Sequence, residues 1–207
     1  MRFRRLLSVV ALLAVAVSGL TACQTKVGQA VAVGEQTLSD SALSGYTQPG
    51  ASPYVDQQNA QVVPKLNVLT NWVRNRLIEA TIAAHGGAVT TPELNAAQAV
   101  IVQSGLPKQI ELANRSHGYT SDFYDLLTEQ YALLVVLIER LAKTSNAGQA
   151  FNILQSGRAN QAFLNAINAT HVPVDLTKRY GTWEQNGLHV STDPAAGAPD
   201  FVTFGSG

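Results

Sequence analysis

The sequence predicts a mainly α-helical fold, a helical bundle around one long central helix, and three observations support this prediction. Residues 121–143 form the longest run that is strongly apolar and free of Gly and Pro. Residues 65–85 carry apolar side chains at helical spacing, up to a glycine pair at 86–87 that suits a helix end. Hydrophobic residues make up 46% of the chain, which is enough to build the core of one domain of ordinary size.

The central segment contains consecutive apolar residues at 133–138, which fit either a buried strand or a helix that is apolar on every side. Its flanks favour the helix. Thr120 or Ser121 can cap the first free amides, and Asp122 suits the positive end of the helix dipole. Arg140 complements the opposite end. We therefore expect one helix of about six turns, exposed at its ends and enclosed at its middle by four or five others.

The amino terminus has the composition of a secretory signal. Arg2, Arg4 and Arg5 precede the apolar run 6–17, which is short for a membrane-spanning helix. Small residues then lead to Cys23, the only cysteine of the chain. A lone cysteine forms no intrachain disulfide and no cysteine-based zinc site.

Leu20, Thr21, Ala22 and Cys23 resemble the lipobox of bacterial lipoproteins. The resemblance implies a signal peptide at 1–22, cleavage before Cys23, and covalent diacylglycerol and N-acyl lipid on Cys23. It places the mature protein at the cell membrane, lipid-anchored on the extracytoplasmic face, with residues 23–27 as the tether. The alternative is a chance cysteine at the end of an uncleaved anchor.

After the tether, residues 28–33 are expected to be extended, with a turn at 34–35. Ser39 is a suitable N-cap for a short helix that runs to about Tyr46. Residues 48–64 are rich in Pro, Gly, Ser, Gln and Asn, and predict a loop.

The helix at 65–85 is followed by a second one, with Thr91 as N-cap and Pro92 at its first position, through about residue 103. A short helical piece at 107–114 precedes the central helix. Another helical segment is expected at 145–167, where Gly157 weakens the middle and either kinks the helix or splits it.

The last part of the chain, at 172–183, is extended in character, and residues 30–33 and 172–176 are expected to pair as a small two-stranded element. A flexible tail is expected over 184–207, because it is rich in Gly, Pro and Ala.

Four stretches resemble the SurA N-terminal domain family and the related parvulin-type foldase lipoproteins of actinobacteria. They are AVAVGEQTLSDSAL at 30–43, GGAVTTPE at 86–93, GYTSDFYDLL at 118–127 and RYGTW at 179–183. The last stretch departs from the family pattern, because Thr177-Lys178 stands where the family has Asn-Pro. The resemblance implies one SurA-N-like helical domain over 28–183. We expect no parvulin isomerase domain, because the segment between the central helix and His171 is too short to hold one.

Catalytic patterns are scarce in the sequence. His85, His117, His171 and His189 lie in loops or beside glycines, without helical metal-site spacing, and we interpret them as solvated. Glu129 and Glu139 share the central helix, but a solvated helix face explains them better than acid–base chemistry. We expect no enzyme, no catalytic residue, no metal and no cofactor.

Arginines of the signal peptide account for three of the 14 basic residues, so the remainder is mildly acidic and gives no reason to expect nucleic-acid binding.

The expected function is therefore that of a non-catalytic chaperone or holdase, a membrane-anchored lipoprotein that binds unfolded or extended exported polypeptides. The alternative is a scaffold lipoprotein with a single defined envelope partner. Aromatic residues near the start of the central helix and in the late extended segment are the candidates for peptide contact: Tyr119, Phe123, Tyr124, Tyr131, Tyr180 and Trp183. For Tyr180 and Trp183, docking onto the bundle remains an equal alternative.

Overall fold

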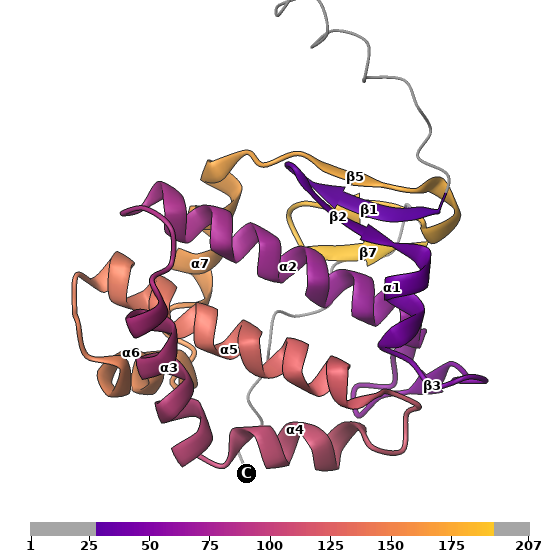
Figure 1. The fold of residues 1–207 in the computed structure, drawn as a ribbon, viewed down its shortest axis with the longest axis horizontal. Helices are drawn as coiled ribbons and strands as arrows, with labels where there is room; N and C mark the ends of the chain where they lie inside the picture. The colour runs from indigo at the N-terminus through magenta and orange to yellow at the C-terminus, as the bar shows by residue number, and fades with distance from the viewer. Residues whose placement is uncertain (1–27, 193–207) are drawn as a thin grey trace, which may run out of the picture.

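The computed structural model describes residues 28–192, so the expected signal peptide, the lipobox with Cys23 and residues 193–207 lie outside the described residues. The described chain is mainly helical, with three small antiparallel sheets (Figure 1). Its helices are α1 (Asp40–Gly45), α2 (Pro64–Ala84), α3 (Thr91–Gln103), α4 (Leu106–Asn114), α5 (Ser121–Ala142), α6 (Ala147–Gln155) and α7 (Asn160–Thr170). Its strands are β1 (Gln29–Val33), β2 (Gln36–Ser39), β3 (Tyr54–Val55), β4 (Gln61–Val62), β5 (Val174–Leu176), β6 (Thr182–Glu184) and β7 (His189–Ser191).

Helix α5 occupies the centre of the fold, as the sequence predicted. It packs against α2, α3, α4 and α6, and every residue from 132 to 138 is buried. Because a helix places these residues on all of its sides, only a ring of neighbours keeps the segment out of water. The helix begins after Thr120, whose hydroxyl donates to the Gly45 carbonyl at 2.8 Å instead of capping the helix, and ends at Lys143 in the left-handed region (φ 52°). No helix among residues 28–192 is long and apolar enough to span a bilayer.

The two ends of the described chain meet in one sheet of order β2-β1-β5, which lies above α2 in Figure 1. Val31 faces Leu176 in the antiparallel β1–β5 ladder, so the expected pairing of the terminal segments is confirmed, with β2 as a further strand. Side chains reinforce the closure. The Tyr180 hydroxyl donates to Asp40 Oδ1 at 2.8 Å, and Arg179 forms an ion pair with the same carboxylate.

Two details of the sequence prediction were wrong, and the structure also decides between a kink and a split at Gly157. The segment 48–64 contains the hairpin β3–β4 and is not only a loop. Helix α3 is capped by Thr90, not Thr91, in a capping box with Glu93: the Thr90 hydroxyl accepts from the Glu93 amide while the Glu93 carboxylate accepts from the Thr90 amide. Gly157, at φ 68°, separates α6 from α7 because this left-handed geometry cannot continue a right-handed helix.

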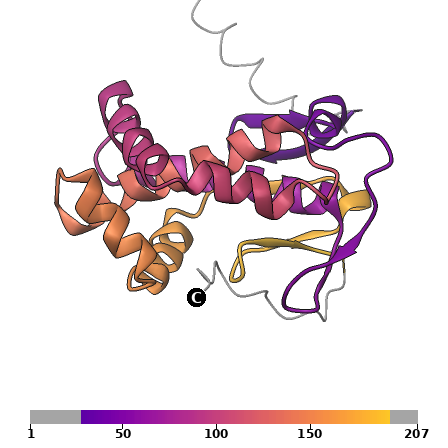
Figure 2. The same cartoon turned by 90° about the horizontal axis from the view of Figure 1, so that it is seen from below.

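The predicted start of the flexible tail at residue 184 was also wrong, because β6 and β7 form an ordered hairpin that packs against α2. Leu188 is fully buried. Polar groups of α2 fix the hairpin: Arg74 Nε donates to the Leu188 carbonyl at 2.7 Å, and the Thr70 hydroxyl accepts from the Val190 amide at 3.1 Å. Figure 2 shows this hairpin on the side of α2 opposite the β1–β2 layer. The Gly, Pro and Ala residues on which the tail prediction rested lie after residue 193, apart from Gly187.

Candidate ligand-binding groove

The aromatic start of α5 packs into the core, which corrects the prediction that Tyr119 and Phe123 contact peptide. Tyr119 is 1% and Phe123 0% exposed, and their rings stack at 4.0 Å between centroids. The Tyr119 hydroxyl accepts from Asn67 Nδ2 at 2.7 Å and lies 3.2 Å from the Tyr54 hydroxyl. A buried tyrosine hydroxyl needs hydrogen-bond partners, and these two groups provide them, so the ring can be buried. Burial raises the pKa of Tyr119.

The other four candidate aromatic residues do not gather in one place. Tyr124 and Tyr131 are half-buried on α5. Tyr180 is held by Asp40, and Arg179 lies over its ring at 5.0 Å. The Trp183 indole donates to Gln185 Oε1 at 2.9 Å within the C-terminal hairpin. For Tyr180 this geometry favours docking of the late segment onto the sheet over contact with a peptide.

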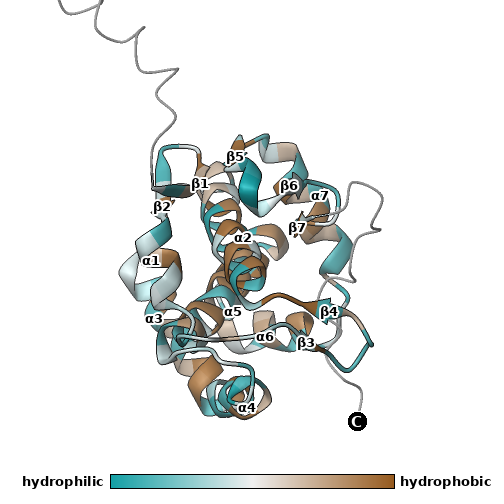
Figure 3. Cartoon of the chain, turned by 90° about the vertical axis from the view of Figure 1, so that its right-hand side faces the viewer, coloured by the Kyte–Doolittle hydropathy of each residue, from teal (hydrophilic) through white to brown (hydrophobic). Residues whose placement is uncertain are grey.

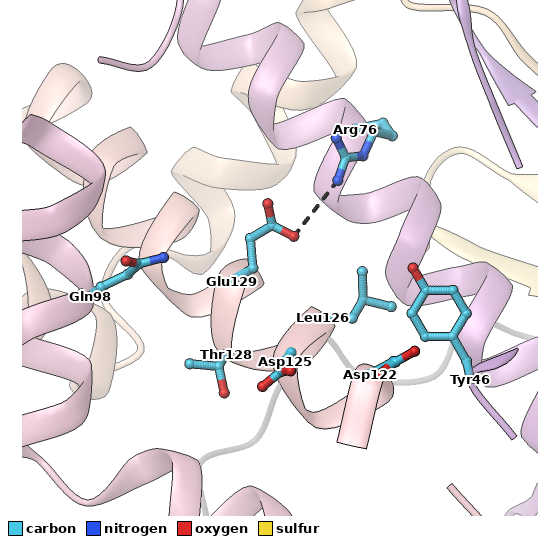
Figure 4. A pocket seen from close by; sticks show the side chains of 8 residues that line it. All are labelled: Tyr46, Arg76, Gln98, Asp122, Asp125, Leu126, Thr128 and Glu129. Carbon is cyan, nitrogen blue, oxygen red and sulfur yellow. Dashed lines mark ion pairs between the residues drawn. The ribbon is translucent and has the colours of Figure 1, made fainter. Parts of the chain in front are cut away.

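The surface instead offers a polar cleft of about 510 Å³ at the junction of α2, α3, α5 and the end of α1, called the acidic hollow below (Figure 4). Asp122, Asp125 and Glu129 project from α5 at helical spacing, so one face of the helix carries all three carboxylates into the cleft. Its complete lining is Tyr46, Arg76, Gln98, Asp122, Asp125, Leu126, Thr128 and Glu129.

A second cleft of about 520 Å³ lies where the β1–β2 turn approaches the C-terminal half of α2, and it is called the apolar hollow. Its lining is dominated by small aliphatic side chains: Val33, Ala80, Ala83, Ala88, Val89 and Val172. Glu35, Gln36 and Glu79 supply its polar rim. Arg76 lines both hollows, which together we call the groove. Polar and apolar residues alternate around the turns of α2 (Figure 3).

Arg76 is the shared wall of the groove and joins three elements. Its guanidinium contacts Glu79 at 2.8 Å, Gln36 Oε1 at 3.1 Å and Glu129 at 3.7 Å, the last drawn as a dashed line in Figure 4. It also lies 5.6 Å from the Trp72 ring, close enough for a cation–π contact. Its Nε is buried without a hydrogen-bond partner in the described part of the chain. Burial raises the pKa of Glu79, and the Arg76 charge opposes this shift.

The two carboxylates of the central helix that the sequence analysis considered, Glu129 and Glu139, do not lie together. Glu129 lines the acidic hollow, whereas Glu139 lies about 15 Å further along α5 and next to Arg140, which pairs with Glu93 at 2.7 Å. No group of three or more His, Asp or Glu side chains within residues 28–192 is placed to hold a metal ion.

Two of the four histidines differ from the solvated state that we expected for all of them. His85 and His171 are exposed, but His117 stacks on Tyr54 with 3.7 Å between ring centroids. His189 is only 7% exposed in the C-terminal hairpin, because the hairpin packs onto α2. Burial lowers the pKa of His189, and the nearby Arg74 charge adds to the effect.

Sequence reasoning missed Arg76, Gln36 and Tyr46 as groove residues. Arg76 and Glu79 are three positions apart on a predicted helix, which is a signal for an ion pair. No sequence signal places Gln36 or Tyr46 beside them, because those contacts depend on how β2 and α1 lie across α2. No protein-family model, no curated protein and no solved structure matches this chain.

Proposed function

We propose that the protein is an extracytoplasmic lipoprotein, anchored through lipid on Cys23, that binds extended segments of exported polypeptides without catalysis, as a holdase-type chaperone. The observation that carries this proposal is the groove, in which one half is aliphatic and the other half polar and charged. Unfolded segments expose both kinds of side chain together, and concave sites with an apolar wall and a few polar groups are typical binding sites.

Further support comes from the resemblance to the SurA N-terminal family. The stretch RYGTW of that resemblance leads into the β6–β7 hairpin here, where Gly181, at φ 105°, lies so near the Ser191 carbonyl that a Cβ would collide with it.

A second candidate is a scaffold lipoprotein with one defined envelope partner, and a specific observation favours it. Large apolar side chains that are exposed in the described part of the chain are few: Val55, Val63, Val102 and Leu112. They lie on different elements, whereas a promiscuous holdase is expected to offer a broader apolar surface.

The two candidates are separated by aggregation assays with several unrelated, chemically unfolded clients. A holdase protects most of them at near-stoichiometric amounts, and Gln98→Trp, which fills the acidic hollow, abolishes the protection. Gln103→Trp is the matched control, because Gln103 is exposed on the same helix and does not line the groove. If no client is protected but one folded envelope protein binds the purified chain saturably, the scaffold function replaces the holdase. Isomerase activity on a proline peptide would contradict both candidates.

A further inference from the structure

We infer that the groove selects one kind of polypeptide segment: an extended stretch that carries a basic side chain toward the acidic hollow and an apolar side chain toward the apolar hollow. The inference rests on the proposed function and adds the chemistry and spacing of the ligand. Three features of the groove support it: its unbalanced charge, its aliphatic half and its length.

The charge of the acidic hollow is unbalanced. Asp122, Asp125 and Glu129 face a single cation, Arg76, which is already in closer contact with Glu79 than with Glu129. Within residues 28–192, Asp122 and Asp125 pair with no basic side chain. Both are exposed, so a Lys or Arg of a ligand can reach them without displacing any contact that holds the fold. Complementary charge of this kind sets which partner is accepted more than how tightly it binds.

Arg76 is the only cation that lines the apolar hollow, and Glu79 and Glu129 already pair with it. Its walls come from the small side chains of α2 and of residues 88–89, and its only charged residue besides Arg76 and Glu79 is Glu35. Apolar surface of a ligand is therefore better accommodated here than a carboxylate, which would meet Glu35 and Glu79.

The length of the groove fixes the separation of the two ligand side chains. α2 and α5 run side by side in the same direction (Figure 1), joined at mid-groove by the Arg76–Glu129 pair. The groove extends about 10 Å along α2, from Arg76 to Ala83, and about 10 Å along α5, from Glu129 back to Asp122. The two lengths add, because they run in opposite directions from the Arg76–Glu129 pair. An extended chain rises about 3.3 Å per residue. The basic and the apolar side chain should therefore be roughly six residues apart.

Dye-labelled peptides of about ten residues test the inference by fluorescence anisotropy with the purified full-length protein. The reference peptide is a Gly/Ser sequence that contains one Arg and one Val at this separation. Replacement of the Arg by Glu, replacement of the Val by Ser, or placement of the two residues next to each other should each weaken binding several-fold. The Arg-dependent part of the affinity should fall as salt rises.

Protein variants locate the two contacts. Asp125→Asn should weaken the Arg peptide about two- to five-fold and leave the Glu peptide unchanged. Ala83→Glu should weaken the Val peptide and leave the Ser peptide nearly unchanged. Asp175→Asn on β5 and Ala113→Glu on α4 are matched controls, because both sites are exposed and outside the groove. Circular dichroism checks that each variant is folded.

Three results would overturn the inference. One is equal affinity for the Arg and Glu peptides. Another is binding that neither Asp125→Asn nor Ala83→Glu changes. The third is concentration-dependent dimerisation that Ala83→Glu abolishes, which would show that a second copy fills the groove. If clients are protected regardless of their charge, only the inference fails and the holdase stands. If no peptide binds and no client is protected, the proposed function fails with it.

Discussion

Replacement of Tyr119 by Phe tests whether the aromatic start of α5 is core or binding surface. The substitution keeps the ring that stacks on Phe123 and removes only the hydroxyl. That hydroxyl accepts from Asn67 Nδ2 at 2.7 Å and lies 3.2 Å from the Tyr54 hydroxyl. Tyr54 and Asn67 are both half-buried, and the Asn67 amide loses the acceptor that the Tyr119 hydroxyl provides.

Loss of a partly buried hydrogen bond costs about 0.5–1.5 kcal/mol, so we expect Tyr119→Phe to lower the free energy of unfolding by that amount. Each kcal/mol corresponds to about 2–4 °C in Tm for a domain of this size. Urea unfolding followed by circular dichroism measures the first quantity and a thermal scan the second. Client protection and peptide affinity should stay unchanged, because Tyr119 lines neither hollow of the groove.

Tyr124→Phe is the matched control, since Tyr124 lies one turn further along α5 and its hydroxyl is 3.5 Å from the Tyr119 carbonyl. Its loss should cost less than about 0.5 kcal/mol. The reasoning is refuted if Tyr119→Phe is as stable as the original protein. It is equally refuted if the variant is stable but no longer binds clients, because Tyr119 would then contact the ligand directly.

Three further predictions concern the core, the C-terminal hairpin and the amino terminus. Val135→Asp should leave no cooperative unfolding transition, because an unpaired carboxylate would replace a 0% exposed side chain at a cost of several kcal/mol. The control Val102→Asp, at a position that is 64% exposed, should stay folded. A Val135→Asp variant that still unfolds cooperatively would contradict the enclosed position of α5. The free energy of unfolding should fall as pH drops below about 6.5, since burial lowers the pKa of His189 in the folded chain and the unfolded chain takes up the proton first. His189→Gln should reduce this slope, and an identical slope in both proteins would exclude His189 as its source. Cys23→Ser should leave the protein unprocessed or free of the membrane fraction, as judged by mass and fractionation; normal acylation of that variant would rule out the lipobox.

The positions of the helices follow from the sequence because caps and apolar spacing are local signals. Ser39 begins α1 as predicted, whereas the Thr90–Glu93 capping box begins α3 one residue before the predicted cap, and Gly157 separates two helices where one segment was expected. The β6–β7 hairpin could not be predicted in this way. Its stability depends on Leu188 and on Arg74, which are far apart in sequence, and no local pattern reports such a contact.

The candidate site was harder to predict than the fold. Aromatic residues of α5 were expected on the surface because one helix face seemed too narrow for them, but Asn67 and Tyr54 satisfy the Tyr119 hydroxyl inside the core. The groove depends on Arg76, whose partners Gln36 and Glu129 come from a strand and a helix on either side of α2 in sequence. Such a site becomes visible only when the packing of these elements is known.

The β1–β5 ladder also determines when the domain can fold. β1 is synthesised early, but Val31 receives its partner Leu176 only when nearly all of the described chain has been made. Until then β1 has only β2 beside it, and an isolated hairpin is marginally stable in water. The ladder that closes the sheet therefore forms late, and the N-terminal strand stays a site for premature pairing with other chains until the C-terminal segment arrives.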